Sequence, residues 1–273
     1  MKASLDGPRA RIAVARQQID RLDQLAKEFV KENPPRAVFE VSSKPGKVDI
    51  RVYDVRPVPL EFGVGIGMVV HNLRAALDGL ACQLALVQSG GSGDANVICE
   101  HTQFPIYLWS QKSAKPGHRE FPKRTNRRVS QFSGYLAMIE EFQPYKRKNG
   151  QARSPLWWLH ELNNTDKHRV LPVVATTNRG VGLRPRLRPQ PGGSVSASIT
   201  GIQISAGLTL KEGTKIGHYD AASPDDVQMD VLMRPDLRFG TSCPAVARRL
   251  VADTLLDMCN SVSDVTESFR SEF

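Results

Sequence analysis

The stretch GMVVHNLRAALDGLACQL, residues 67–84, decides the fold because it joins a helical apolar pattern to polar side chains near its middle. Apolar residues recur at three- and four-residue steps, which predicts a helix over 64–88 with one buried face: Val69, Leu73, Leu77, Leu80 and Leu84. On a helical wheel, His71, Arg74 and Asp78 share the opposite side, with Asn72 on one flank. Arg74 and Asp78 are one turn apart, so we expect an ion pair between them.

A second stretch, WWLHELNNTDKHR at 157–169, has the same mixture of side chains. Ser154 and Pro155 are typical of a helix start, and the pattern predicts a helix over 155–171. One face of this helix carries His160, Asn163, Asn164 and Lys167. Buried polar groups cost free energy unless they are paired, so the two polar faces should satisfy each other. We therefore expect these two helices to be neighbours.

The other segments complete an α+β protein. They predict a helix and β-hairpin within 8–56, a short helix at about 128–142, strands within 173–233 and a helix over 243–271. Gly-x-Gly-x-Gly at 63–67 lacks the context of a dinucleotide-binding loop, so we interpret it as a flexible helix entry. The prediction is one domain over 1–273: a bundle of four to five helices with a small, mostly antiparallel sheet.

Composition excludes several classes of protein. No apolar run is long enough for a transmembrane helix, and the N-terminal residues lack an apolar signal-peptide core, so we expect a soluble cytoplasmic protein with no membrane partner. The four cysteines show no Cys-x-x-Cys spacing, which indicates reduced and mostly buried thiols at Cys82, Cys99, Cys243 and Cys259. The sequence carries no signal for an oligomeric state.

Positive charge is concentrated in the middle of the chain. The net charge is +9, and residues 110–153 contain eleven Lys or Arg against three acids, a surplus of eight. Clustered cations suit a polyanion such as RNA or DNA, and a solvated loop that keeps the protein soluble is the competing interpretation. The candidate binding cations in this region are Lys123, Arg124, Arg127, Arg128, Lys146, Arg147 and Lys148.

The sequence offers no pattern for a metal or cofactor site. His160 and His168 are two helical turns apart, about 12 Å, which is too far for one ion. Phosphate-loop, nucleophile-elbow and zinc-protease motifs are absent from the sequence. We therefore predict neither a metal nor a cofactor.

GIGMVVHNLRAALDGLACQLA (65–85), FPI (104–106) and LHELNNTDKHRVL (159–171) together resemble a family of uncharacterised bacterial and phage-encoded proteins. Its two signatures are of the kind His-Asn-Leu-Arg-x-Ala-Leu-Asp-His-Leu and Leu-x-x-Leu-x-x-x-Asp-Lys-His-Arg. The resemblance covers roughly residues 64–171 and implies no established activity. In that family the residue after the aspartate is commonly His, which gives a spacing similar to that of HEPN ribonucleases. This chain has Gly79 at that position.

Two functional hypotheses follow. In the first, the protein binds nucleic acid, Asn72, Asn163, Asn164 and Lys167 are binding candidates, and an inward polar network fixes how the helices pack. In the alternative, a HEPN-like, metal-independent ribonuclease uses His71 or His160 as acid and base. Arg74 with Lys167 would then stabilise the transition-state charge, and Asp78 would hold Arg74 or a histidine in place.

Overall fold

The computed structural model describes residues 2–100, 102–107, 128–146, 153–177, 182–187, 199–221, 227–232 and 235–273. It has the predicted α+β class. The chain divides into two compact units, where the sequence predicted one domain. The helical unit comprises Met1–Asp23, Leu60–Pro172 and Thr241–Phe273, and the strand unit comprises Gln24–Pro59 and Val173–Gly240.

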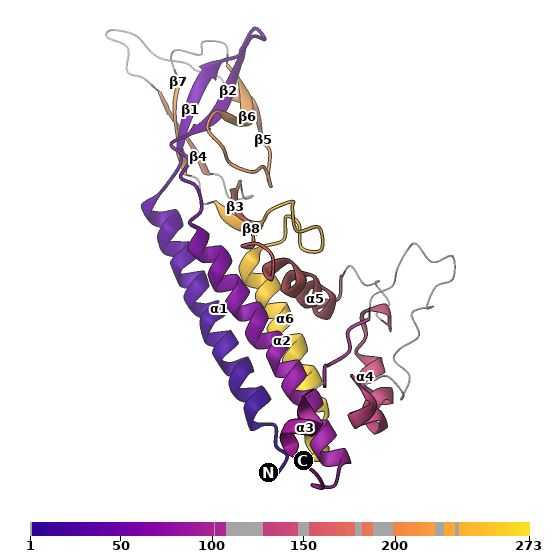
Figure 1. Ribbon diagram of the computed structural model, residues 1–273. Helices are drawn as coiled ribbons and strands as arrows, with labels where there is room; N and C mark the ends of the chain where they lie inside the picture. The colour runs from indigo at the N-terminus through magenta and orange to yellow at the C-terminus, as the bar shows by residue number, and fades with distance from the viewer. Residues whose placement is uncertain are drawn as a thin grey trace, which may run out of the picture. The chain divides into compact units, whose positions relative to one another are not determined.

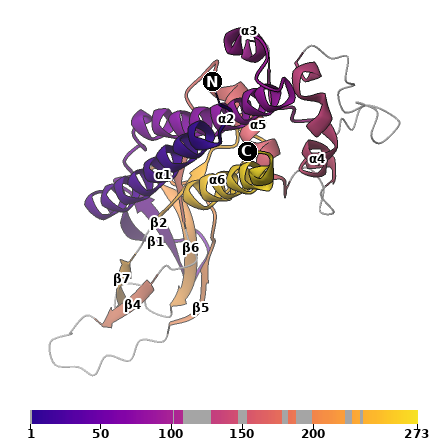
Figure 2. The same ribbon diagram turned by 90° about the horizontal axis from the view of Figure 1, so that it is seen from below.

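The central element of the helical unit is α2 (Leu60–Gln88), with α1 (Asp6–Glu32) and α6 (Val251–Ser268) side by side with it (Figures 1 and 2). It also packs against α5 (Pro155–Asp166) and α3 (Ala95–Cys99). The predicted apolar face of α2 is fully buried at all of its five leucine and valine positions. Short helices complete the unit: η1 (Ser130–Tyr135), α4 (Leu136–Glu141), η2 (Pro144–Lys146) and η5 (Arg270–Glu272).

Polar contacts fasten α1 to α6 at the surface of the unit. Arg9 donates to both carboxylate oxygens of Glu267, at 2.7 and 2.8 Å, and Arg16 donates to the Asn260 side chain at 2.8 Å. Beneath these contacts, α1 buries the apolar stripe that its sequence predicts through Ile12, Ala15 and Ile19.

The glycines at 63–67 lie inside α2, so their interpretation as a flexible helix entry is wrong. A Cβ at Gly63 would overlap the backbone carbonyl of Leu171, and a Cβ at Gly67 would overlap the Asp166 carboxylate. A Cβ at Gly65 would press on the Leu22 side chain of α1. These glycines allow neighbouring segments to approach the α2 backbone closely on two sides.

Three predicted helices also differ from the structure. The helix expected over 155–171 ends at Asp166, and the helix expected from 243 begins at Val251. Arg248 adopts a φ of 64°, which a right-handed helix cannot include, so the chain turns before α6 starts. In place of the helix expected at about 128–142, η1 is followed directly by α4, and Phe132 (φ −132°) kinks the chain within η1.

Antiparallel strands build the strand unit. Its largest described sheet has the order β1 (Arg36–Val41), β2 (Lys47–Tyr53), β6 (Thr214–Ala221) and β5 (Ile199–Ile204). β3 (Val173–Thr176) pairs with β8 (Asp236–Phe239), and β4 (Gly182–Leu187) pairs with β7 (Val227–Leu232). The hairpin β1–β2, predicted separately from the later strands, therefore shares one sheet with β5 and β6. Its core contains Val48, Ile50, Val52, Ile216 and Tyr219.

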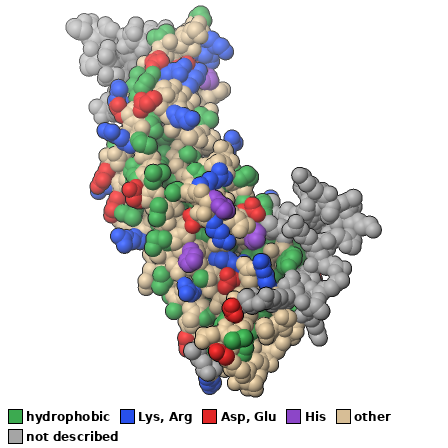
Figure 3. Space-filling view, in the orientation of Figure 1, with side chains coloured by type: hydrophobic (Ala, Val, Ile, Leu, Met, Phe, Trp, Pro, Cys, Tyr) green, Lys and Arg blue, Asp and Glu red, His purple; other side chains and the backbone are tan. Residues whose placement is uncertain are grey.

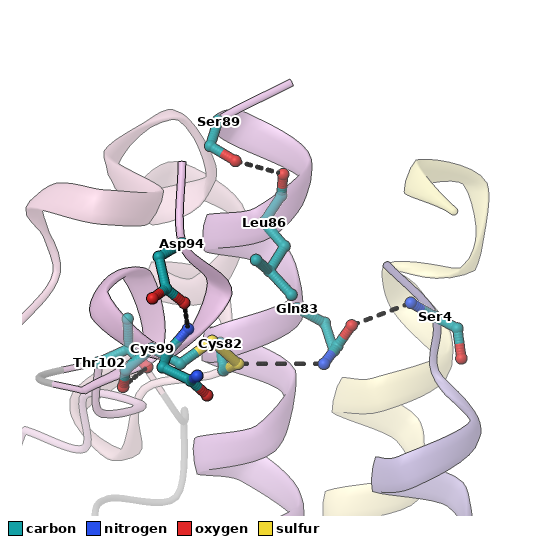
Figure 4. Close-up of a disulfide and its surroundings, with 9 residues drawn as sticks. Ser4, Cys82, Gln83, Leu86, Ser89, Asp94, Cys99 and Thr102 are labelled. Atoms are coloured by element: carbon teal, nitrogen blue, oxygen red, sulfur yellow. Dashed lines mark hydrogen bonds between the residues drawn. A yellow bond between two sulfur atoms is a disulfide. The ribbon is translucent and has the colours of Figure 1, made fainter. Parts of the chain in front are cut away.

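A disulfide joins Cys82 of α2 to Cys99 of α3 (Figure 4). The expectation of four reduced cysteines is wrong at this pair, whereas Cys243 and Cys259 are free and buried. The two bonded cysteines are 17 residues apart, and the turn at 89–94 folds α3 back onto α2 to bring them together. Among the described residues, no helix is long and apolar enough to cross a membrane.

Candidate functional site

Arg74 and Asp78 form the predicted i, i+4 ion pair, and together they clamp the backbone of Phe104. Arg74 Nη2 lies 2.7 Å from Asp78 Oδ1, and its Nε donates to Asp78 Oδ2 at 3.2 Å. The same Nη2 donates to the Phe104 carbonyl at 2.7 Å, while the Phe104 amide donates to Asp78 Oδ1 at 3.0 Å. Arg74 is only 7% exposed. The pair thus fixes the Phe-Pro-Ile segment against α2.

His160 of α5 lies within the electrostatic reach of that clamp. Burial lowers its pKa, and the positive charges of Arg74 and Lys167 lower it further. The imidazole is half-buried and is held toward its neutral form, which can accept a proton. The prediction that α2 and α5 are neighbours is confirmed, and the charges of Arg74 and Lys167 both act on His160.

His71 belongs to a different part of the same interface. It lies beside Asp166 at the end of α5, whose carboxyl pKa is raised by burial and lowered in part by the charge of His71. Both residues line an open groove of about 370 Å³. The groove lining also includes Val64, Gly67, Met68, Asn72 and Val170.

The remaining polar residues predicted for the two helices are dispersed. Asn72 donates to the Gln18 side chain of α1 at 3.2 Å, Asn163 is half-buried, and Asn164 and Lys167 are exposed. Histidine and basic side chains are visible where α2 and α5 lie side by side (Figure 3). The sequence predicted that the polar groups of the two helices meet at one site. The structure instead divides them between the Arg74–Asp78 clamp, with His160 near it, and the groove that His71 lines.

Of the seven candidate binding cations within 110–153, two fall within the described residues, and both have protein partners. Arg128 donates to the Gln103 side chain at 2.9 Å. Lys146 lies 3.4 Å from a Glu141 oxygen and 3.8 Å from a Glu140 oxygen. The other five lie outside the described residues: Lys123, Arg124, Arg127, Arg147 and Lys148.

Gly79 faces away from the clamp. A Cβ at this position would meet Pro8 of α1 at 3.6 Å, which is ordinary van der Waals contact. A histidine there would therefore leave α2 toward the start of α1, while Arg74 and Asp78 reach toward Phe104. The histidine that the resemblance implies at position 79 would therefore not reach the Arg74–Asp78 clamp in this chain.

Sequence reasoning missed Asp166 and Phe104 as parts of these sites. The signal for Asp166 was the pair Gly63 and Gly67, one turn apart on α2, which marks a face approached closely by another segment. No such signal exists for Phe104, because it contributes only its backbone amide and carbonyl.

Across the part of the chain that the structure describes, no group of three or more His, Cys, Asp or Glu side chains is arranged to hold a metal ion. Comparisons of the chain with protein-family models, with curated proteins and with solved structures find no match.

Proposed function

We propose that this protein binds nucleic acid and that its Arg74–Asp78 pair is structural. The observation that carries the proposal is the surplus of eight positive charges within residues 110–153 of a chain whose net charge is +9. Such a surplus favours association with phosphates through the release of counterions. The clamp supports the non-catalytic assignment, because the Arg74 guanidinium is buried and already bonded to Asp78 and Phe104.

The direct test is fluorescence anisotropy with labelled single-stranded RNA, single-stranded DNA and duplex DNA over a series of salt concentrations. Replacing Lys123, Arg124 and Arg127 with Gln should weaken binding to all three probes, because phosphate contacts carry no sequence information. A matched control replaces three exposed cations of α1, Arg11, Arg21 and Lys31, with Gln. An equal loss in the control would assign binding to net charge alone, and no binding at low salt would contradict the proposal.

The ribonuclease alternative keeps one favourable observation, the lowered pKa of His160 beside Arg74 and Lys167. A neutral imidazole next to cations suits a general base acting near a phosphate. Under this alternative, purified protein cleaves RNA, and both His71→Ala and His160→Ala abolish the cleavage. Intact RNA after prolonged incubation, or cleavage unaffected by both substitutions, eliminates it.

We propose further that the protein resides in the cytoplasm. The Cys82–Cys99 disulfide provides a test of this location. Disulfides rarely persist in a reducing cytosol. Rapid alkylation of living cells that express the chain should therefore label Cys82 and Cys99 if the protein resides there. Protection of both thiols would indicate an oxidising compartment.

A further inference from the structure

The groove between α2 and the end of α5 has the features of a small ligand site. Its volume of about 370 Å³ lies at the lower end of the range for such sites, about 300–1,000 Å³. Val64, Met68 and Val170 supply apolar walls, and they are 52%, 54% and 45% exposed. Large apolar side chains this exposed around one groove are suited to covering a flat apolar group.

The polar end of the groove is a hydrogen-bond acceptor. Within the described part of the chain, no residue donates a hydrogen bond to the Asp166 carboxylate, and Gly67 leaves room for it against α2. Asn72 uses its amide N–H on Gln18, which leaves its carbonyl oxygen able to accept. A ligand in this groove therefore has an apolar body and N–H donors at one edge.

Charge restricts the source of those donors. A phosphate group would be repelled by the Asp166 carboxylate, so the nucleic-acid backbone does not fit at this end of the groove. A lysine or arginine of a protein partner would satisfy Asp166, but its chain would meet a protein of net charge +9. The ligand must offer uncharged N–H donors to Asp166 and must also be part of a molecule that a protein of net charge +9 attracts. An unstacked nucleobase of an anionic nucleic acid strand satisfies both conditions.

We propose that the groove lined by Val64, Met68, His71 and Asp166 binds a single unstacked guanine of a nucleic acid strand. A carboxylate has two acceptor oxygens and prefers two parallel N–H donors. Among the four standard bases, guanine alone carries two adjacent donors on its Watson–Crick edge, N1–H and the N2 amino group. Val64, Met68 and Val170 cover the faces of the base, and the exposed imidazole of His71 lies at the polar end. This inference rests on the proposed nucleic-acid binding and assigns its base preference.

The test compares labelled oligouridines that carry one central base: guanine, inosine, 1-methylguanine, adenine or uracil. Inosine lacks the N2 amino group and 1-methylguanine lacks the N1–H. Each lacks one of the two donors and should therefore bind wild-type protein more weakly than guanine does, by up to about tenfold, because a complete bidentate contact is worth about tenfold or more. These probes leave the protein unaltered, so the comparison does not depend on the folding of any variant.

Asp166→Asn should remove the preference for guanine, because an amide has one acceptor oxygen where a carboxylate has two. The ratio of the guanine to the uracil probe is the readout, since loss of a negative charge strengthens binding to every probe. Asp257→Asn, an exposed position on α6, makes the same charge change away from the groove and should keep the ratio.

The outcomes separate this inference from the function on which it rests. If no probe binds at low salt, nucleic-acid binding itself fails. If every probe binds equally, or if Asp166→Asn keeps the guanine preference, the protein binds nucleic acid but the groove does not recognise guanine through Asp166. Binding of an oligolysine peptide that Asp166→Asn abolishes would assign the groove to a cationic protein partner and overturn the inference.

Discussion

Arg74 shows how one buried side chain can serve packing and leave little for chemistry. Its guanidinium holds both Asp78 oxygens and the Phe104 carbonyl, so it joins α2 to a segment 30 residues further along the chain. Arg74→Ala removes the donor of Phe104 and the partner of Asp78 together. We expect a loss of about 2–3 kcal/mol in the free energy of unfolding, below the range for fully buried pairs because Asp78 is partly exposed.

Urea unfolding followed by circular dichroism measures this loss. Arg74→Lys keeps the charge but not the forked donors, and it should recover only part of the stability. Arg11→Ala, at an exposed position of α1, is the control and should change stability little. An unchanged midpoint for Arg74→Ala would mean that the clamp does not hold the Phe104 segment in solution.

His160 makes the stability of the protein depend on pH. Its folded-state pKa lies below the ordinary value of 6.5, because burial and the neighbouring cations oppose its positive form. Above pH 6.5 both states hold the neutral imidazole, whereas between that value and the folded pKa only the unfolded chain takes up the proton. Stability should therefore fall as the pH drops through this window, by less than the limit of about 1.4 kcal/mol per pH unit for one proton.

Unfolding curves between about pH 8 and pH 5 test this dependence around the ordinary histidine pKa. His160→Gln should flatten the curve in that window, and the exposed His168→Gln should leave it as in wild type. A wild-type slope that survives in His160→Gln would assign the effect to another group.

The α2–α3 pair shows what a covalent bond adds to a short helix. α3 has five residues and none is buried, so its packing contributes little to holding it against α2. Closing a loop of this length with a disulfide stabilises a fold by about 3 kcal/mol in the chain-entropy account. Cys82→Ser with Cys99→Ser should lower the melting temperature accordingly, and a reductant should lower that of wild type but not of the double variant.

A thiol count checks the same bond independently. Denatured protein that has been oxidised in air should show two reactive thiols, from Cys243 and Cys259, and four only after reduction. Four thiols after air oxidation would contradict the Cys82–Cys99 pair.

Helices and strands with strong periodicity were predictable, but their ends were not. The apolar pattern of α2 and the alternation of β2 depend on local spacing alone, so sequence was sufficient for them. The end of α5 at Asp166 and the start of α6 at Val251 depend on contacts with distant segments, such as the bond from Arg169 to the Ser242 carbonyl. Such contacts leave no local signal.

The same distinction applies to the candidate sites. The Arg74–Asp78 pair follows from helical spacing and was predicted correctly. To predict the groove, one must know where the end of α5 packs against α2, and only tertiary packing determines that. The partners of His71 and His160 could therefore not be assigned from the sequence.

The positive charges of the chain act together on a bound nucleic acid strand. Their combined effect on affinity can be measured separately from the effect of any one contact. Neutralising Lys123, Arg124 and Arg127 should reduce the slope of log Kd against log salt by up to about 2 for a single strand, since each phosphate contact contributes about 0.7. Asp166→Asn should leave that slope unchanged while it alters base preference. A slope unaffected by the triple substitution would show that these cations do not contact the strand.

The close approach of Asp166 to α2 has a consequence for how this chain can change over evolutionary time. Position 67 has no space for even a methyl group while the carboxylate of residue 166 rests on it. The two positions are thus mutually constrained: in any descendant, an alanine at 67 requires a shorter or displaced side chain at 166. Substitution of position 67 together with a change or a shift of the side chain at position 166 is the evolutionary record that this contact should leave.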